Sequence, residues 1–319
     1  MRSSWHVVPR PGWCQASGRS TRGGAVQQRS VTFHSDGRKL AGVLRLPAGA
    51  APEAPRPAVV FCAGMSLVKE VWLPAQAERL VEAGFVTLNF DYSGFGESEG
   101  TPRRRLLPWR QVRDVRHALT YLASLPEVDE TRLGLSGTSL GAAVSIAAAV
   151  DRRVKAAVGI AGPMDLGRVW SRFAGFPAFR AKVARARERY VAEGEVSYVS
   201  VASLLKSDPA TCALLEEEVE NYSTWSLKIT YESLLDLFEF DAERDLPATR
   251  AALLWIAPEK DELIAGCEAQ SAYAKAGEPK AIVILPEAEH VDVYRAESPA
   301  HQRLQDEQLA WFQRHLGAS

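Results

Sequence analysis

Residues 132–143 of the chain read RLGLSGTSLGAA, an apolar run that leads into a glycine-flanked serine and then into small residues. The central five residues, Gly137-Thr138-Ser139-Leu140-Gly141, form a G-x-S-x-G sequence. In a tight turn between a strand and a helix, flanking glycines remove Cβ atoms where the backbone crowds itself. The N-terminus of the following helix favours a negative charge that develops nearby. The stretch therefore predicts a nucleophilic serine, Ser139, on a strand-to-helix turn.

Predicted strands and helices alternate on both sides of this turn. Apolar runs are separated by amphipathic or alanine-rich segments, which is typical of a mostly parallel sheet with helices on both faces. We expect strands at 31–34, 39–46, 58–62, 86–90, 132–136, 154–160, 251–257 and 281–285, and helices at 71–84, 108–124, 140–150, 266–276 and 300–315. The sequence thus predicts an α/β fold with a doubly wound, mostly parallel sheet.

The alternation lapses between residues 166 and 249, a stretch too long for a plain loop. Expected helices at 177–192 and 230–239 indicate a mainly helical insertion, which we interpret as a cap (lid) over the sheet. The insertion holds eleven of the chain's 27 Phe, Trp and Tyr residues. Because ligands bind at the carboxyl edge of open α/β sheets, these rings predict an apolar pocket wall. Trp170 and Phe173 follow soonest after the preceding strand and are the predicted substrate-binding residues.

The rest of the chain divides into a catalytic domain and a tail. Residues 30–165 and 250–319 form the predicted α/β catalytic domain. Residues 1–29 contain five arginines, no acidic residue and many Ser, Gly and Gln residues. Such a composition resembles a transit peptide, but without a clean amphipathic period it predicts a disordered tail.

The composition argues against several other classes of protein. Lys and Arg total 38 and Asp and Glu total 39, a near-neutral balance that disfavours a nucleic-acid-binding surface. No apolar run approaches the roughly 18 residues that span a bilayer. The four cysteines stand far apart and form no metal-ligand spacing. We therefore expect no metal, no disulfide framework and a cytoplasmic location.

The serine turn, with its strand and helix, resembles that of the α/β-hydrolase superfamily, and more narrowly of its dienelactone-hydrolase and Xaa-Pro-peptidase (acyl-esterase-like) branch. A second shared motif is AGMSLVKE at 63–70, where related enzymes usually carry His-Gly. Ala63 replaces that histidine, and Gly64 is retained. The resemblance implies that the backbone amides of Met65 and Leu140 form the oxyanion hole.

The resemblance also implies an acid and a base, which follow the serine in that order along the chain. The loop PEKDELI at 258–264 is similar to the family's G-x-x-D-x-x-V-P, which implies Asp261 as the acid. Glu259 and Glu262 are then surface charges on the same loop. His290 ends the loop after the last expected strand and is the implied base.

A third motif, DYSGFGES at 91–98, is similar to the family's D-x-R-G-x-G-x-S turn. Ser93 stands where arginine is common in the family. Short acidic side chains often fix a turn by accepting hydrogen bonds from nearby backbone. We therefore interpret this turn as architectural, with Asp91 bonded to local backbone.

Together these residues predict a serine hydrolase of carboxylic esters or thioesters. His290 would take the Ser139 proton, Asp261 would fix the imidazole, and the serine would attack an acyl carbonyl to form an acyl-enzyme. This chemistry needs no metal and no organic cofactor. The expected partner is a small-molecule acyl substrate, and a homodimer is left open.

Three alternatives keep the fold and change the function. Some hydrolase-fold enzymes of natural-product (polyketide-like) pathways transfer an acyl group or eliminate acetate, and a dry aromatic cap suits that chemistry. A short-peptide aminopeptidase would need an acidic pair that holds a substrate amine, and the sequence does not single one out. A non-catalytic receptor would have no use for a Ser–Asp–His set. Fold alone does not decide among them.

Overall fold

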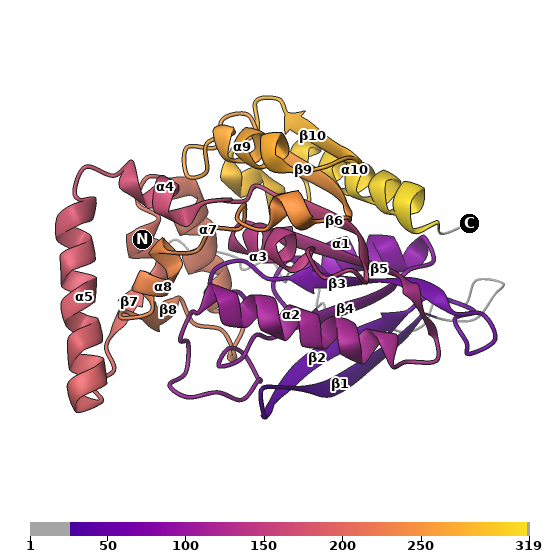
Figure 1. Cartoon of the computed structure of the whole chain (residues 1–319), viewed down its shortest axis with the longest axis horizontal. Coiled ribbons are helices and arrows are strands. Elements are labelled where there is room, and N and C mark those ends of the chain that lie inside the picture. The colour runs from indigo at the N-terminus through magenta and orange to yellow at the C-terminus, as the bar shows by residue number, and fades with distance from the viewer. Residues whose placement is uncertain (1–25, 318–319) are drawn as a thin grey trace, which may run out of the picture.

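In the part of the chain that the structure describes, residues 26–317, eight strands form the central sheet in the order β1-β2-β4-β3-β5-β6-β9-β10 (Figure 1). The structure is a computed structural model. The strands are β1 (Gln27–Ser35), β2 (Arg38–Leu46), β3 (Arg56–Cys62), β4 (Val86–Phe90), β5 (Val128–Thr138), β6 (Val154–Ile160), β9 (Ala252–Pro258) and β10 (Lys280–Leu285). β2 pairs antiparallel with β1 and β4, and all other pairings in this sheet are parallel. The predicted α/β fold with a mostly parallel sheet is confirmed.

Helices cover both faces of this sheet, as Figure 1 shows. α1 (Leu73–Glu82) and α10 (Pro299–Leu316) pack on one face, and α2 (Pro108–Ala123), α3 (Leu140–Ala148) and α9 (Cys267–Lys275) lie on the other. In α1 the buried residues Leu73, Ala77, Leu80 and Val81 recur every three to four positions, so a single face of the helix packs on the sheet. Among the helices of the described chain, none is long and apolar enough to cross a membrane.

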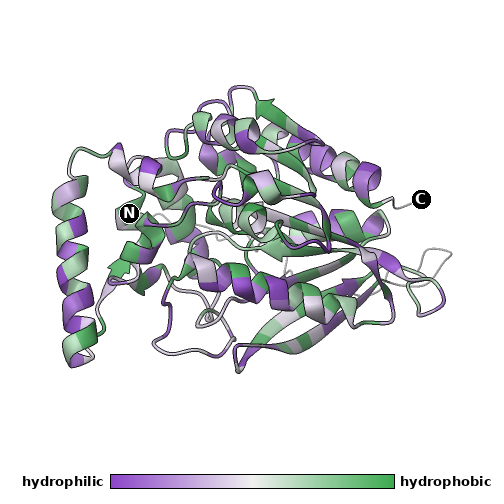
Figure 2. Cartoon of the chain, viewed as in Figure 1, coloured by the Kyte–Doolittle hydropathy of each residue, from purple (hydrophilic) through white to green (hydrophobic). Residues whose placement is uncertain are grey.

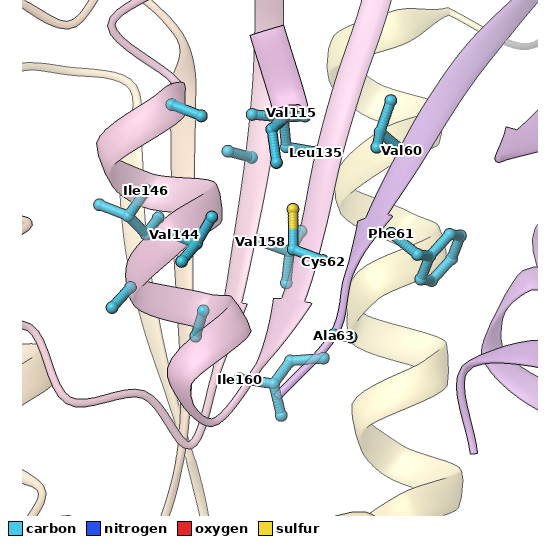
Figure 3. Close-up of a cluster of buried hydrophobic side chains, with 14 of the residues drawn as sticks. Val60, Phe61, Cys62, Ala63, Val115, Leu135, Val144, Ile146, Val158 and Ile160 are labelled. Atoms are coloured by element: carbon cyan, nitrogen blue, oxygen red, sulfur yellow. The ribbon is translucent and has the colours of Figure 1, made fainter. Parts of the chain in front are cut away.

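The middle strands of the sheet form the apolar centre of the molecule. β3, β5 and β6 are covered on both faces, which is why much of their sequence is apolar. Figure 3 shows one cluster there, in which Leu135 and Val158 of the sheet lie near Val144 and Ile146 of α3. Figure 2 shows the same strands as hydrophobic and the outer helix faces as mixed. This packed core fixes the positions of the turns that follow the strands.

The insertion between β6 and β9, for which we keep the name cap, lies beside the sheet and consists of one long helix, several short helices and two short strands (Figure 1). It contains α4 (Leu166–Ser171), α5 (Phe176–Glu193), β7 (Tyr198–Ser200), α6 (Val201–Leu204), α7 (Pro209–Val219), β8 (Lys228–Thr230), α8 (Leu234–Phe238) and the 3₁₀ turn η1 (Leu246–Ala248). The helix expected at 177–192 corresponds to α5. The helix expected at 230–239 is shorter, because Thr230 pairs with Tyr198 in the small β7–β8 sheet instead. Three-residue strands carry too little alternation to be recognised in a sequence.

The first strand begins earlier than predicted. β1 starts at Gln27, which lies opposite Leu46, so residues 27–29 of the predicted tail belong to the sheet. The start of β1 lies at the sheet edge with its first four side chains exposed, and therefore shows no alternation of apolar and polar residues. The part of the predicted tail at 1–25 lies outside the described residues.

Candidate active site

Ser139 lies on the turn between β5 and α3, at the carboxyl end of the sheet. Its backbone has φ 56° and ψ −125°, a strained conformation for a residue with a side chain. The Ser139 N–H donates to the carbonyl oxygen of Ile160 at 2.8 Å and ties the turn to β6. A Cβ atom on Gly141 would lie 2.1 Å from the carbonyl oxygen of Cys62, so only glycine fits there. The G-x-S-x-G sequence thus has the turn geometry that it predicts.

Asp261 and His290 meet at the carboxyl ends of β9 and β10. Oδ2 of Asp261 lies 2.7 Å from Nδ1 of His290, and both side chains are buried. Oδ1 of Asp261 accepts the backbone N–H groups of Leu263 at 3.0 Å and Ile264 at 2.7 Å. Both carboxylate oxygens of Asp261 have hydrogen-bond partners, so the carboxylate holds the imidazole of His290 in one orientation. Nδ1 donates its proton to Asp261, and Nε2 is left as the hydrogen-bond acceptor of the ring.

Tyr294 lies beside His290 and near Ser139, and the sequence did not predict it. Its ring is T-shaped to that of His290, with centroids 5.9 Å apart. Burial raises the pKa of the Tyr294 phenol, and the neighbouring Ser139 side chain acts in the opposite direction and lowers it. Tyr294 directly follows the 3₁₀ turn η2 (His290–Val293). Because η2 is a 3₁₀ turn with about three residues per turn, the helical spacing of four gives no signal that could have revealed Tyr294 from the sequence. The serine, the histidine and the tyrosine therefore lie together at one point of the sheet edge.

Other polar side chains near this point have different partners. Ser136 is buried in β5, and its hydroxyl accepts a hydrogen bond from Gln308 at 2.6 Å. Glu259 accepts the N–H of Glu287 at 2.9 Å, and Nδ1 of His301 lies 2.8 Å from a carbonyl oxygen of η2. Within residues 26–317, no group of three His, Cys, Asp or Glu side chains is arranged to hold a metal ion.

The two predicted oxyanion-hole amides flank the serine. Met65 follows β3, and Leu140 is the first residue of α3. Within the described chain the Met65 N–H donates to no protein acceptor, and the Leu140 N–H lies in the first helical turn, where such groups have no partner in the helix. A Cβ atom on Gly64 would lie 3.6 Å from Cβ of Ser139, so the loop after β3 runs beside the serine. Both N–H groups can therefore donate to an oxygen bound next to Ser139.

Asp91 holds the loop that carries Met65. Its Oδ1 accepts the N–H of Lys69 at 2.8 Å, and its Oδ2 accepts Nζ of Lys69 at 2.8 Å and the N–H of Glu97 at 3.0 Å. Burial alone would lower the pKa of Lys69, but the hydrogen bond and charge of Asp91, together with the hydrogen bonds to Glu70 and Glu97, outweigh it and raise that pKa. Asp91 thus binds local backbone, as predicted, and also orients a loop that lacks the histidine of related enzymes.

Trp170 and Phe173 line a cavity of about 480 Å³ in the cap. The remaining aromatic residues of its wall are Phe176, Phe179, Tyr198 and Tyr231. The described residues that line it include none of Ser139, Asp261 and His290. The structure therefore brings the two predicted substrate-binding residues together, in a cavity whose walls belong to the cap.

An apolar cluster joins the cap to the acid loop. Val169, the neighbour of Trp170, packs against Leu263 and Ile264, and Leu205 of the cap packs on the same cluster. Leu263 and Ile264 are the residues whose N–H groups hold Asp261. The cap therefore packs directly on the loop that carries Asp261.

A cluster of ion pairs anchors the cap to the body. Arg168 of α4 lies 2.6 Å from Glu268 of α9 and 2.7 Å from Glu243, and Glu243 also pairs with Lys275. Both glutamate side chains are buried. Burial would raise the pKa of Glu243, but its hydrogen bonds to Arg168, Lys275 and Ser271 outweigh burial and lower that pKa. The cap is thus held to α9 by charges as well as by apolar contacts.

Comparison with known proteins decides the family. A model of the alpha/beta hydrolase family matches residues 59–302, a range that contains every predicted catalytic residue. The chain belongs to the alpha/beta hydrolase family. The predicted recognition of the superfamily is thereby confirmed, and the narrower dienelactone-hydrolase branch stays a prediction.

This alpha/beta hydrolase is similar to other proteins over most of its length. It is 28% identical over 298 residues to an uncharacterized 31.7 kDa protein from the traX-finO intergenic region of Escherichia coli, with 90% of this chain and 99% of that protein covered. It is also 28% identical to a thiohydrolase of Eupenicillium brefeldianum, with 83% and 88% covered. The crystal structure of the hypothetical protein PA2218 of Pseudomonas aeruginosa matches with a TM-score of 0.78 at 26% identity, with 98% and 100% covered.

Proposed function

We propose that this alpha/beta hydrolase is a serine hydrolase that cleaves carboxylic esters or thioesters with an apolar acyl part. The observation that carries the proposal is the 2.7 Å contact between Asp261 and His290, at the sheet edge where Ser139 occupies its strained turn. A buried acid–histidine pair beside a glycine-flanked serine is the arrangement that acyl transfer to serine uses. A ligand receptor on the same fold would not need it.

In the proposed reaction, Nε2 of His290 takes the Ser139 proton as Oγ attacks the acyl carbonyl. Asp261 stabilises the imidazolium that forms. The amides of Met65 and Leu140 donate to the oxyanion, and each such donor contributes about 3–4 kcal/mol to the stability of the transition state. His290 then protonates the leaving alcohol or thiol, and water repeats the cycle to release the acid. These proton transfers need no metal and no organic cofactor.

The residues of the cap favour an apolar substrate in this proposal. Six aromatic residues line its cavity, and Val169 of the cap packs against Leu263 and Ile264 of the acid loop. Pockets of this kind take bulky apolar groups and leave orientation to a few polar atoms. The similarity to a protein named thiohydrolase supports thioesters beside oxygen esters as the scissile group.

A panel of p-nitrophenyl esters of graded chain length, run beside acyl thioesters and aminoacyl-p-nitroanilides, tests the proposal. We expect turnover that favours bulky apolar esters or thioesters, and covalent labelling of Ser139 by a fluorophosphonate. Turnover of the anilides alone would make the protein a peptidase, and labelling of another serine would remove Ser139 from the mechanism. Products formed in the presence of an added alcohol or amine acceptor separate hydrolysis from acyl transfer.

A further inference from the structure

The cap cavity carries positive charge on an otherwise apolar wall. Beside its six aromatic rings, the described residues that line it include one charged side chain, that of Lys206, and no acidic one. Lys206 is exposed, and within residues 26–317 its ammonium forms no ion pair and no hydrogen bond. Gly175 and Phe176, at the N-terminus of α5, also line the cavity, and this end of a helix bears a partial positive charge. The cavity therefore suits a ligand that combines an apolar part with a negative charge.

Two further cations lie next to the aromatic wall. The guanidinium of Arg104 lies over the ring of Tyr198, 4.6 Å from its centroid, and Nη1 of Arg104 donates to the hydroxyl of Ser226 at 3.0 Å. Burial raises the pKa of the Tyr231 phenol, and the positive charge of nearby Arg185 acts in the opposite direction. Among the described residues neither arginine pairs with a carboxylate. The charge of Lys206 is therefore reinforced by its surroundings.

Carboxylates that neighbour the lining residues in the chain have partners of their own. Glu232 is buried and pairs with Arg105 at 2.9 Å and with Arg187 at 3.1 Å. Asp208 is buried as well, and Thr211 binds both of its oxygens, one through the backbone N–H at 2.9 Å and the other through the hydroxyl at 2.5 Å. These two carboxylates are therefore not available to neutralise the cations of the cavity, and an anionic ligand would meet them without such a competitor.

A short segment of the cap, residues 204–208, lies between the cavity and the catalytic loops. Lys206 lines the cavity, whereas its neighbour Leu205 packs on the apolar cluster of the acid loop. α7, which follows this segment directly, packs against η2, the turn that begins with His290. The same few residues therefore contact the cavity on one side and the loops of the predicted acid and base on the other.

We propose that the cap cavity binds the far end of an acyl group that terminates in a carboxylate, and that Lys206 recognises this carboxylate. The inference rests on the proposed function, the cleavage of an ester or thioester at Ser139. The aromatic rings hold the apolar part of the acyl group, and the ammonium pairs with its terminal charge. A cavity of about 480 Å³ is in the range of pockets that bind small molecules. Since Lys206 is the one cation among the described lining residues, a singly charged carboxylate fits better than a phosphate dianion.

Two esters of equal chain length test the recognition of the charge: p-nitrophenyl octanoate and the p-nitrophenyl monoester of octanedioic acid. We expect the wild type to have the higher kcat/KM for the acid-ended ester. Lys206→Gln should lower the ratio of the two kcat/KM values roughly 2- to 5-fold, the effect of one ion pair that is open to solvent, and Lys206→Glu should lower it further. High salt should move the wild-type ratio toward that of Lys206→Gln, because salt screens such a pair. The corresponding esters of hexanedioic and decanedioic acid show which chain length reaches Lys206.

Lys182→Gln is the matched control, because Lys182 is an exposed lysine of α5 that does not line the cavity. It should leave the ratio unchanged. Since the ratio compares two substrates on one preparation of enzyme, a loss of folded protein affects both values equally and cancels. A purely structural role of Lys206 would therefore leave the ratio as it is in the wild type.

A ratio that is the same in the wild type and in both Lys206 variants would overturn the inference. A wild type that prefers the uncharged ester at every chain length would also overturn it. Inhibition by inorganic phosphate but not by octanedioate would assign the cations to a phosphate group instead. In each of these cases, cleavage of p-nitrophenyl octanoate and fluorophosphonate labelling of Ser139 would show that the inference fails alone. If no ester is cleaved and Ser139 is not labelled, the proposed function fails and the inference fails with it.

Discussion

The α/β body and the cap position their side chains by different means. In the body, Asp261 and Asp91 each accept three hydrogen bonds at the ends of buried strands. In the cap, α5 has two buried residues, Val183 and Ala186, and meets α8 through edge-on rings around Phe238 and through the partly exposed ion pair of Arg187 with Asp236. Hydrogen bonds fix distance and direction closely, whereas ring contacts tolerate several geometries. From this difference we expect the body to determine the chemistry and the cap to determine which substrates are bound.

The substitution Ser139→Ala should break the chemistry of the body while leaving both parts folded. It removes one hydroxyl from a turn, so we expect a loss of activity of roughly 10⁴-fold or more and little change in melting temperature. Steady-state kinetics and fluorophosphonate labelling measure the loss. Activity that survives in the variant would show that another residue carries the reaction.

The substitution Asp91→Asn should impair the body without touching the predicted triad. It leaves the buried ammonium of Lys69 without its fully buried partner and loosens the loop of Met65. We expect a loss of stability of about 3 kcal/mol, and a fall in kcat of ~100-fold because one oxyanion donor is misplaced.

The surface variant Asp306→Asn, which removes an exposed contact with Arg79, is the control and should change neither quantity. A fall in melting temperature with normal kcat of the folded fraction would restrict Asp91 to a structural role.

The substitutions Trp170→Ala and Phe173→Ala should alter substrate choice and spare the chemistry. Each lost apolar contact should cost about 1–3 kcal/mol in discrimination, or roughly 10- to 200-fold, for octanoate and phenylacetate esters, with acetate esters least affected. The control is Tyr190→Ala, a cap ring that stacks on Arg105 outside the cavity. The rings of Trp170 and Phe173 also contact neighbouring rings in the cap. An equal loss of activity for every ester, in step with the melting temperature, would therefore assign these two residues to packing alone.

The smallest expected effect concerns the ion pairs that anchor the cap. The pKa of Glu243 is lowered in the folded protein, so its contribution to stability is full above the ordinary glutamate pKa of about 4.3 and is lost as the pH falls through the lower folded value. Glu243→Gln should therefore lower the melting temperature by a few degrees at pH 7, and the difference from wild type should shrink in acid. Glu239→Gln, which removes an exposed contact with Arg180, should leave the curve unchanged. A difference that persists in acid would point to packing rather than charge.

The sequence predicted the body better than the cap for physical reasons. Strands covered on both faces are apolar throughout, so β4 and β6 have the bounds that the pattern predicts. The serine turn is a local motif, and its strained backbone follows from its own glycines. The clamp between Asp91 and Lys69 and the pairing of Asp261 with His290 depend instead on which strands lie side by side. Local periodicity carries no such information, and neither does it indicate that the cap cavity has walls of its own.

The two ends of the cap are bonded to each other, as well as to the body. Asp165 and Asp241 form an isolated antiparallel bridge, and the Ala242 N–H donates to the carbonyl oxygen of Met164 at 2.8 Å. The chain therefore departs from β6 and returns toward the neighbouring strand β9 through one narrow neck. Because loop closure costs little extra as the loop lengthens, the stretch beyond this neck can grow, shrink or be exchanged without shifting the register of any strand. We therefore expect related chains to differ more in the stretch beyond this neck than in the strands of the central sheet.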